Sequence, residues 1–268
     1  MNLVNTEGDR MKALKELYAY RQMIAGLVRK DLRGRYKGSI LGFLWTFINP
    51  LLQLMVYTMV FSVIMKNGIE KYYIYLFVAL IPWIFFSTSI TSGCSSVIAS
   101  KEMVKKIYFP REVLPIATVT SGFINMLYCF IVIFAVLLVA RIGFNFYAIL
   151  CLPVIMIVEY LLSLGFALIF SALTVYFRDL EYVLGIITMA WMYLTPVLYS
   201  IDNVPEELRH ILMLNPMSPV IIAFRDILYY KQIPQMNTLI SALAVGILSC
   251  VLGYLIFHKL QKHFVEEL

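Results

Sequence analysis

Charged residues are scarce in this sequence, since Asp, Glu, Lys and Arg together make up 14% of its 268 residues. A soluble globular protein usually has about 25% charged and about 45–50% apolar residues, whereas 61% of this chain is apolar and its mean hydropathy is +0.82. This composition excludes an ordinary water-soluble enzyme and leaves no stretch for a separate soluble domain. The sequence therefore predicts an integral membrane protein.

Histidine and cysteine are also few and scattered. The three His are scattered (His210, His258 and His263), no C-x-x-C pair occurs, and each of the four Cys lies inside an apolar run: Cys94, Cys129, Cys151 and Cys250. These residues offer neither a metal-ligand set nor a disulfide framework, so we expect no metal site and interpret the thiols as helix packing. The start, Met1 to Asp31, lacks the apolar core and cleavage site of a removable signal peptide.

Long runs without charge mark the predicted membrane spans. A helix needs about 20 apolar residues to cross about 30 Å of hydrocarbon. The run Ile211 to Phe224 is too short and contains two prolines, so we interpret it as re-entrant or interfacial. The sequence predicts one all-α membrane domain over residues 1–268, with an outer-side re-entrant region at 202–236 and six transmembrane helices at about 39–65, 72–99, 113–140, 146–177, 182–201 and 237–257.

The distribution of Lys and Arg predicts the orientation. Basic residues are retained in cytoplasmic loops. With six spans, 16 of the 22 Lys and Arg lie on the side that holds both termini, and 6 lie on the other side. We therefore expect both termini in the cytoplasm and a multi-pass location in the plasma (inner) membrane. The net charge of +6 is a topology signal, and we expect no nucleic acid as a partner.

The N-terminal segment, about 10–31, has the pattern of an amphipathic helix that lies on the membrane. Its apolar residues recur at three or four positions: Leu14, Leu17, Tyr20, Ile24 and Leu27. A basic cluster follows directly before the first span: Arg29, Lys30, Arg33, Arg35 and Lys37. The cluster is either a positive-inside anchor or a seat that recruits a phosphate-bearing lipid, and both interpretations can hold together.

The second cytoplasmic segment, 100–112, is short, charged and aromatic. Lys101 to Tyr108 can form two helical turns, and Pro110 then removes a backbone donor and favours extended geometry at Phe109. Such a segment is either a solvated loop or a short rigid helix that docks a soluble partner.

Three stretches resemble a known family. They are 33–45 (RGRYKGSILGFLW, followed by Asn49 and Pro50), 106–115 (KIYFPREVLP), and 176–180 (YFRDL, with LNPMSP at 214–219 and FRD at 224–226 beyond it). On these motifs the chain resembles the permease subunits of ABC-2 type exporters for lipid-linked polysaccharides, which export O-antigen, capsule, teichoic acid or rhamnan. The likeness covers essentially the whole chain in order and length.

The resemblance implies six transmembrane helices, an N-terminal gate helix, a cytoplasmic coupling helix and short re-entrant helices between spans five and six. It also implies a nucleotide-binding subunit and a second copy of the chain as partners, with a polyprenyl-linked polysaccharide as cargo. The P-loop pattern is absent from the chain, so we expect no enzyme activity here, with ATP and Mg²⁺ bound by the partner subunit. The resemblance implies these residues for coupling to that subunit: Lys101, Lys105, Lys106, Tyr108, Phe109, Arg111, Glu112, Arg178 and Asp179.

Polar and aromatic residues at helical spacing suggest a substrate pathway. Such residues in a span avoid lipid and face protein or a cavity. The predicted channel for the glycan is lined by Tyr36, Trp45, Thr46, Asn49, Gln53, Tyr57 and Phe61 around span one, and by Tyr193 and Tyr199 in span five. The alternative is ordinary helix packing.

Two other functions compete with this one. One is an ABC-2 permease for a drug or small lipid. The other is an integral membrane glycosyl- or acyltransferase, which needs convergent acids or His near a membrane surface. Glu159, the one acid within a predicted span, stands alone and gives thin support to an enzyme or to proton coupling.

Overall fold

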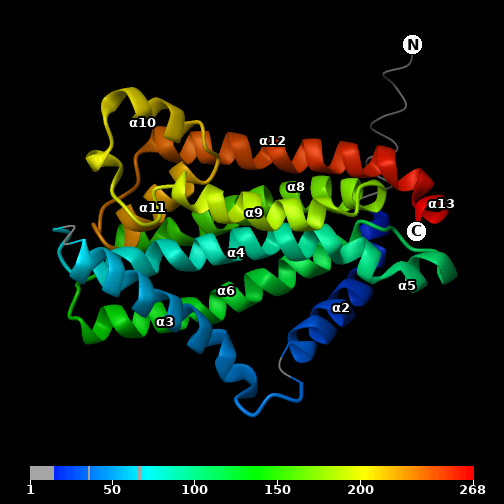
Figure 1. The fold of residues 1–268 in the computed structure, drawn as a ribbon, viewed down its shortest axis with the longest axis horizontal. Helices are drawn as coiled ribbons and strands as arrows, with labels where there is room; N and C mark the ends of the chain where they lie inside the picture. Colours follow the sequence, from blue (N-terminus) through cyan, green and yellow to red (C-terminus); the bar gives the residue numbers. More distant parts are fainter. Residues whose placement is uncertain (1–14, 36, 66–67) are drawn as a thin grey trace.

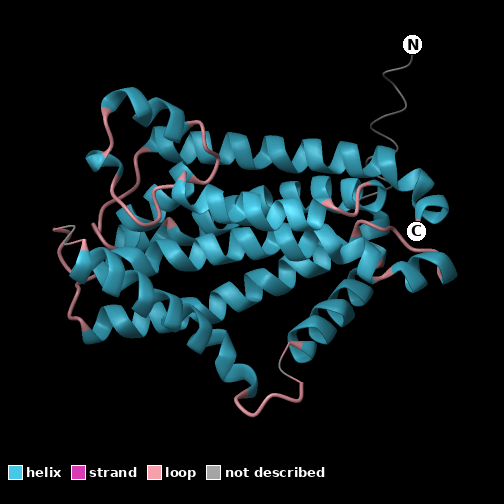
Figure 2. Ribbon diagram, in the orientation of Figure 1, coloured by secondary structure: helices cyan, strands magenta, loops and turns pink. Residues whose placement is uncertain are grey.

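The protein is a bundle of long helices. A computed structural model describes residues 15–35, 37–65 and 68–268, and this described part contains no strand (Figure 2). The elements are α2 (Arg21–Gly34), η1 (Gly42–Leu44), α3 (Trp45–Thr58), η2 (Met59–Ile64), α4 (Tyr72–Ala99), α5 (Lys101–Lys106), α6 (Val113–Val139), α7 (Phe146–Leu150), α8 (Leu152–Tyr176), α9 (Leu180–Tyr193), η3 (Ile201–Asn203), α10 (Glu206–Met213), α11 (Ser218–Leu228), α12 (Met236–Leu260), η4 (Gln261–His263) and α13 (Phe264–Glu267).

The helices confirm the predicted all-α membrane fold. Five stretches are long and apolar enough to cross a membrane: Gly42–Ile64, Tyr72–Ala99, Val113–Val139, Phe146–Tyr176 and Met236–His263. The first of them ends in a π-helical turn, η2. Helices α10 and α11 meet at 100° and form a broken span or a re-entrant loop, as expected between the last two spans. Counted as one span, this pair raises the total to six.

The span predicted at 182–201 is shorter than expected. Helix α9 ends at Tyr193 after 14 residues, and the chain continues through tight turns to Tyr199. Pro196 explains the stop, because proline has no backbone N–H and disfavours helical geometry at the residue before it. At 1.5 Å per residue, the helix itself covers only part of a bilayer.

Helix α4 is the central helix of the bundle, and 78% of its most apolar window is buried. It packs against α3, α6, α8, α9 and α11 and runs parallel to α9 and α12 (Figure 1). Helices α5 and α13 lie at one end of the bundle, and α10 lies at the other (Figure 1). We call these the α5 end and the α10 end.

The N-terminal helix packs its apolar side against the bundle. Residues 15–19 are helical, and α2 continues after a turn at Tyr20. Residues 10–14 of the predicted interfacial helix lie outside the described residues. Val28 is buried, helix α2 contacts α6, and Leu17, Tyr20, Ile24 and Leu27 pack on a hydrophobic cluster at the α5 end. The helix is inclined to the long helices (Figure 1). Four of the five residues that carry the amphipathic pattern lie on this packed side.

The chain turns sharply between α2 and α3. Gly38 and Gly42 have φ angles of +84° and +47°, which residues with a side chain rarely adopt. This turn brings α3 back along the bundle on the side of α4 and α6. The end of α2 and the start of α3 therefore frame one region.

Candidate functional site

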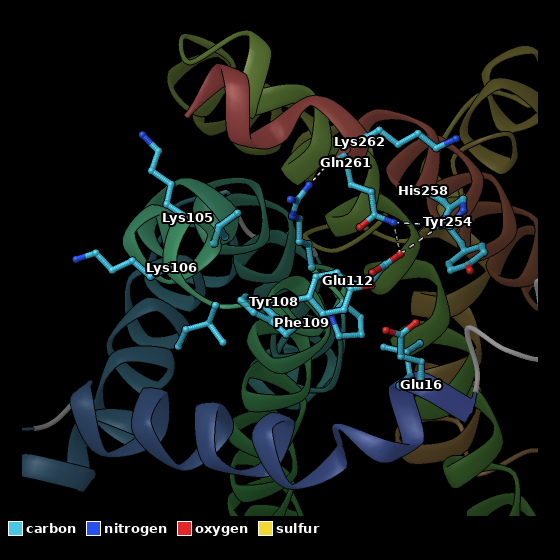
Figure 3. A pocket seen from close by; sticks show the side chains of 15 residues that line it. Glu16, Lys105, Lys106, Tyr108, Phe109, Glu112, Tyr254, His258, Gln261 and Lys262 are labelled. Atoms are coloured by element: carbon cyan, nitrogen blue, oxygen red, sulfur yellow. Dashed lines mark hydrogen bonds and ion pairs between the residues drawn. The ribbon is translucent and has the colours of Figure 1, made fainter.

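The predicted coupling segment forms one wall of a cavity at the α5 end. The cavity has a volume of about 590 Å³ and is lined by residues 104–112, by Glu16 and Leu17, and by the end of α12 with its continuation, at Tyr254, His258, Gln261 and Lys262 (Figure 3). Helix α5 ends at Lys106, and Ile107 is extended. The short helix and its stop before Pro110 agree with the pattern in the sequence.

Two of the predicted coupling residues make contacts inside the molecule. Arg111 donates a hydrogen bond to the backbone carbonyl of Gln261. The Gln261 side chain donates to Glu112 Oε1 at 2.7 Å and lies 3.1 Å from His258 Nδ1, and Glu112 itself is buried (Figure 3). The guanidinium of Arg111 also lies 5.8 Å from the ring centre of Phe264. Arg111 and Glu112 therefore fasten the C-terminal end of the chain to the coupling segment.

The remaining predicted coupling residues divide by exposure. Tyr108 is 85% exposed, and Lys105 and Lys106 are also exposed (Figure 3). Phe109 is buried in the hydrophobic cluster beneath the segment. Lys101, Arg178 and Asp179 are exposed. Because Tyr176 donates a hydrogen bond to the Leu260 carbonyl, Arg178 and Asp179 lie at the same end of the bundle.

Four of the predicted channel residues line one cavity. It has a volume of about 330 Å³ and lies between α3, α4, α6 and the end of α2, where it is lined by Trp45, Thr46, Asn49, Gln53, Arg35 and residues of α4 and α6. We call it the inner cavity. Trp45 also donates a hydrogen bond from Nε1 to Ser39 at 3.1 Å. The structure thus brings the start of the span-one stripe together with one residue of the predicted basic cluster.

The other predicted channel residues lie further along the bundle. Tyr57 points to α9, where its hydroxyl is 3.8 Å from Met192 Sδ, and Phe61 packs on Tyr72. Tyr199 donates a hydrogen bond to the Tyr193 carbonyl at 3.1 Å. The stripes of α3 and α9 therefore meet beside α4, although these four residues do not line the inner cavity. Tyr36 lies outside the described residues.

The predicted basic cluster lies on the exposed side of α2 and just beyond it. Arg29, Lys30, Arg33 and Lys37 are exposed and make no ion pair within the described residues. Arg35 differs, because its Nε and Nη2 atoms lie 3.0 and 2.9 Å from Asp31 Oδ2. The cluster is a cationic surface, and one of its members, Arg35, lines the inner cavity.

A second cavity lies on the other side of Arg35. It has a volume of about 450 Å³ between α2, α4 and α6, and we call it the hydroxyl cavity because its lining includes Ser92, Ser95, Ser96, Ser100 and Thr118 beside Lys30, Asp31 and Arg35. Sequence reasoning missed these hydroxyls. The spacing of the four serines along and just after the end of α4 places them on one helix face, which is a signal that the sequence does contain.

No metal centre was found in the described part of the chain, where no three His, Cys, Asp or Glu side chains are close enough to hold an ion. Glu159 is fully buried in α8, and its two carboxylate oxygens have no hydrogen-bond partner within residues 15–35, 37–65 and 68–268. It lines none of the three cavities described above.

Comparison with known proteins gives one family for most of the chain. The sequence model of the ABC-2 type transporter family matches residues 22–229. The O-antigen export system permease protein RfbA of Myxococcus xanthus is 32% identical over 263 residues, which are 96% of this chain and 100% of that protein. An RfbA protein of Klebsiella pneumoniae is 34% identical over 92% of this chain and 95% of its own length. The capsule polysaccharide export inner-membrane protein CtrC of Neisseria meningitidis is 23% identical over 76% of this chain and 78% of its own length.

Proposed function

This chain belongs to the ABC-2 type transporter family, and from that membership we propose that it is the permease subunit of an ATP-driven exporter of a polyprenyl-diphosphate-linked cell-surface polysaccharide. One observation carries the choice of cargo. A permease that exports O-antigen is 32% identical to this chain over its whole length. A capsule polysaccharide export protein is similar at lower identity, which supports the same chemical class.

The energy for transport would come from a nucleotide-binding subunit that binds ATP and Mg²⁺. Its docking surface on this chain would be the exposed part of the coupling segment, Lys101, Lys105, Lys106 and Tyr108, with Arg178 and Asp179 beside it. A buried Phe109 and the contacts of Arg111 and Glu112 make this surface rigid. A displacement of Tyr108 by the nucleotide-binding subunit would therefore be transmitted to the end of α12 through the contacts of Arg111 and Glu112 with Gln261.

The pathway would run between two copies of the chain. Helix α3 is the most exposed of the long helices, with 6% of its most apolar window buried. Helix α9 also has an exposed apolar side, which includes Ile186 and Met189. Paired copies would bury these surfaces and would face the inner cavity with its Trp45 and Asn49 side chains. An aromatic ring and polar side chains suit contact with sugar rings and hydroxyls.

The charge distribution supports the direction of transport. Sixteen of the 22 basic residues fall on the side of both termini, so the α5 end would lie in the cytoplasm. The relative from Neisseria meningitidis is an inner-membrane protein by name. We propose the plasma (inner) membrane as the location, with cargo that enters near α2 and leaves at the α10 end.

A deletion and rescue experiment tests this function. Cells that lack the chain are expected to lose the surface polysaccharide and to accumulate polyprenyl-linked glycan inside, and the wild-type chain is expected to restore export. Normal surface polysaccharide after deletion would contradict the proposed cargo. A drug-export role would instead leave the glycan unchanged and alter drug resistance.

Tyr108→Ala tests the docking surface. A Tyr at the centre of an interface often contributes 2 kcal/mol or more, so we expect the affinity for the nucleotide-binding subunit to fall about thirtyfold or more. ATP turnover of the reconstituted complex would fall with it, at unchanged thermal stability of the permease. Tyr147→Ala is the matched control, because Tyr147 is also exposed, at 71%, but lies outside the coupling segment. The neighbouring Asn145 bonds to the Lys231 carbonyl, between α11 and α12. Equal turnover for both variants would place docking elsewhere.

A further inference from the structure

Arg35 separates two cavities that differ in chemistry. On one side is the inner cavity with its Trp45 and Asn49 side chains, and on the other is the hydroxyl cavity. Arg35 is the first residue after α2, and its backbone N–H bonds to the Asp31 carbonyl. Because Arg35 lines both cavities, it lies in the wall that the two cavities share.

Asp31 holds that wall in place. Its Oδ2 atom accepts hydrogen bonds from Arg35 Nε at 3.0 Å and Nη2 at 2.9 Å, and also from the hydroxyl of Ser121. Ser121 is fully buried in α6. One carboxylate oxygen thus joins the end of α2 to α6 and neutralises the guanidinium that faces both cavities.

The hydroxyl cavity has the chemistry of an anion site. Lys30 lines it and makes no ion pair within the described residues. Neither the Ser92 nor the Ser100 side chain makes a hydrogen bond in the described part of the chain, so both hydroxyls can donate to a ligand. Arg35 already binds one anionic oxygen, that of Asp31. Guanidinium, ammonium and hydroxyl groups together are donors that phosphate oxygens accept.

We propose that a lipid-borne phosphate group binds in the hydroxyl cavity and competes with Asp31 for Arg35. This inference rests on the proposed function, since the phosphate would be that of the polyprenyl diphosphate. A phosphate held by Lys30, Ser92 and Ser100 would draw Arg35 away from Asp31. Asp31 would then keep only its bond to Ser121, and the wall between the hydroxyl cavity and the inner cavity would open where Arg35 had been. Asp31 is a positioning residue that keeps this wall shut without a ligand.

The charges in the hydroxyl cavity predict whether a substitution strengthens or weakens phosphate binding. Lys30 and Arg35 with Asp31 leave one net positive charge there. Asp31→Asn keeps an oxygen that accepts from Ser121 and frees Arg35 from its carboxylate partner, so the guanidinium becomes available to the phosphate. One more available cation near an anionic lipid headgroup corresponds to roughly fivefold tighter binding.

Binding of farnesyl diphosphate to the purified complex, reconstituted in phosphatidylcholine nanodiscs, measures the effect. We expect Asp31→Asn to bind about fivefold more tightly than wild type and Arg35→Gln about fivefold more weakly. In the double variant, the gain from Asp31→Asn is expected to vanish, because Asp31 acts through Arg35. Glu102→Gln is the matched control. It removes the acid of another i,i+4 pair, 3.1 Å from Lys106, and is expected to leave binding unchanged.

The arms of the experiment separate the possible outcomes. Equal competition by inorganic diphosphate would show that the phosphate groups suffice, whereas competition by phosphatidylglycerol alone would overturn a diphosphate site. If Asp31→Asn still strengthened binding fivefold in the Arg35→Gln background, competition between the phosphate and Asp31 for Arg35 would be overturned. The gain would then come only from the loss of a negative charge near the ligand. If wild type binds farnesyl diphosphate and Asp31→Asn is unchanged, the inference fails and the proposed function stands. No binding by wild type, together with normal surface glycan after deletion, would remove the proposed function itself.

Discussion

Arg225→Met is expected to lower the free energy of unfolding by roughly 4 kcal/mol. The Arg225 guanidinium is buried and donates to backbone carbonyls of two segments: the turn at Val197 (2.5 Å), Tyr199 (3.2 Å) and Pro196, and helix α4 at Tyr75 (3.4 Å). It also stands 3.7 Å from the ring centre of Tyr75. Methionine fills similar volume but donates nothing, so the Pro196 and Val197 carbonyls would lose their donors. The Tyr199 carbonyl would keep its bond from the Tyr75 hydroxyl.

The contacts of Arg225 explain how the chain tolerates the early end of α9. Pro196 stops the helix and leaves the carbonyls of the following turn without helical donors. Arg225 on α11 supplies those donors and ties the turn to the start of α4 at Tyr75. No carboxylate lies within ion-pair distance of Arg225 in the described residues, so carbonyl dipoles and one aromatic ring balance its charge.

Thermal unfolding of the detergent-purified permease checks this prediction. A loss of this size corresponds to a midpoint lower by on the order of 10 °C for a chain of this length. Arg209→Met is the matched control, since Arg209 also donates to two carbonyls, Val204 at 2.9 Å and Asp202 at 2.7 Å, but is half-buried. Equal midpoints for the two variants would contradict the role of burial. Arg225→Lys is expected to be intermediate, because one ammonium cannot reach four carbonyls.

The spans were predictable from the sequence because a charge in hydrocarbon is costly. The charge-free runs therefore overlap the long apolar stretches of the structure: Gly42–Ile64, Tyr72–Ala99, Val113–Val139, Phe146–Tyr176 and Met236–His263. The end of α9 was not located, because hydropathy continues past Pro196 and only the proline signals the stop. The sequence alone also gives no reason to expect that Arg225 completes that turn, since the two segments are almost thirty residues apart.

The candidate sites were predictable to a smaller extent. Spacing brought Trp45, Asn49 and Gln53 onto one helix face, and the inner cavity contains all three. Arg111 and Glu112 look like docking residues in a charged loop, yet both contact Gln261, which lies 150 residues further along the chain. Such contacts depend on how α12 ends beside the coupling segment. Asp31 lies among the basic residues of positions 29–37, and its contact with Ser121 depends on the packing of α2 on α6.

Gly165→Ala is expected to destabilise the fold by about 3 kcal/mol or more. A Cβ atom at Gly165 would lie 2.3 Å from the Ser249 carbonyl carbon and 2.4 Å from its oxygen. Both obstacles are backbone atoms of α12, which cannot rotate away as a side chain can. The reverse approach is equally close, because a Cβ atom at Gly253 would lie 2.4 Å from the Gly165 oxygen. Helices α8 and α12 would have to separate along their length.

Whether a Gly→Ala change lowers or raises the stability of the fold distinguishes close packing from helix propensity. Alanine is the better helix former by about 1 kcal/mol, so a glycine inside a helix without close neighbours should gain stability on the same change. Gly185 in α9 is that control, since a Cβ atom there would meet nothing within 4 Å. We expect Gly185→Ala to hold or raise the unfolding midpoint and Gly165→Ala to lower it sharply, with less folded protein in gel filtration. A stable Gly165→Ala variant would mean that α8 and α12 do not touch through their backbones. In that case the end of α12, which Gln261 joins to the coupling segment, would not be rigidly tied to the bundle core.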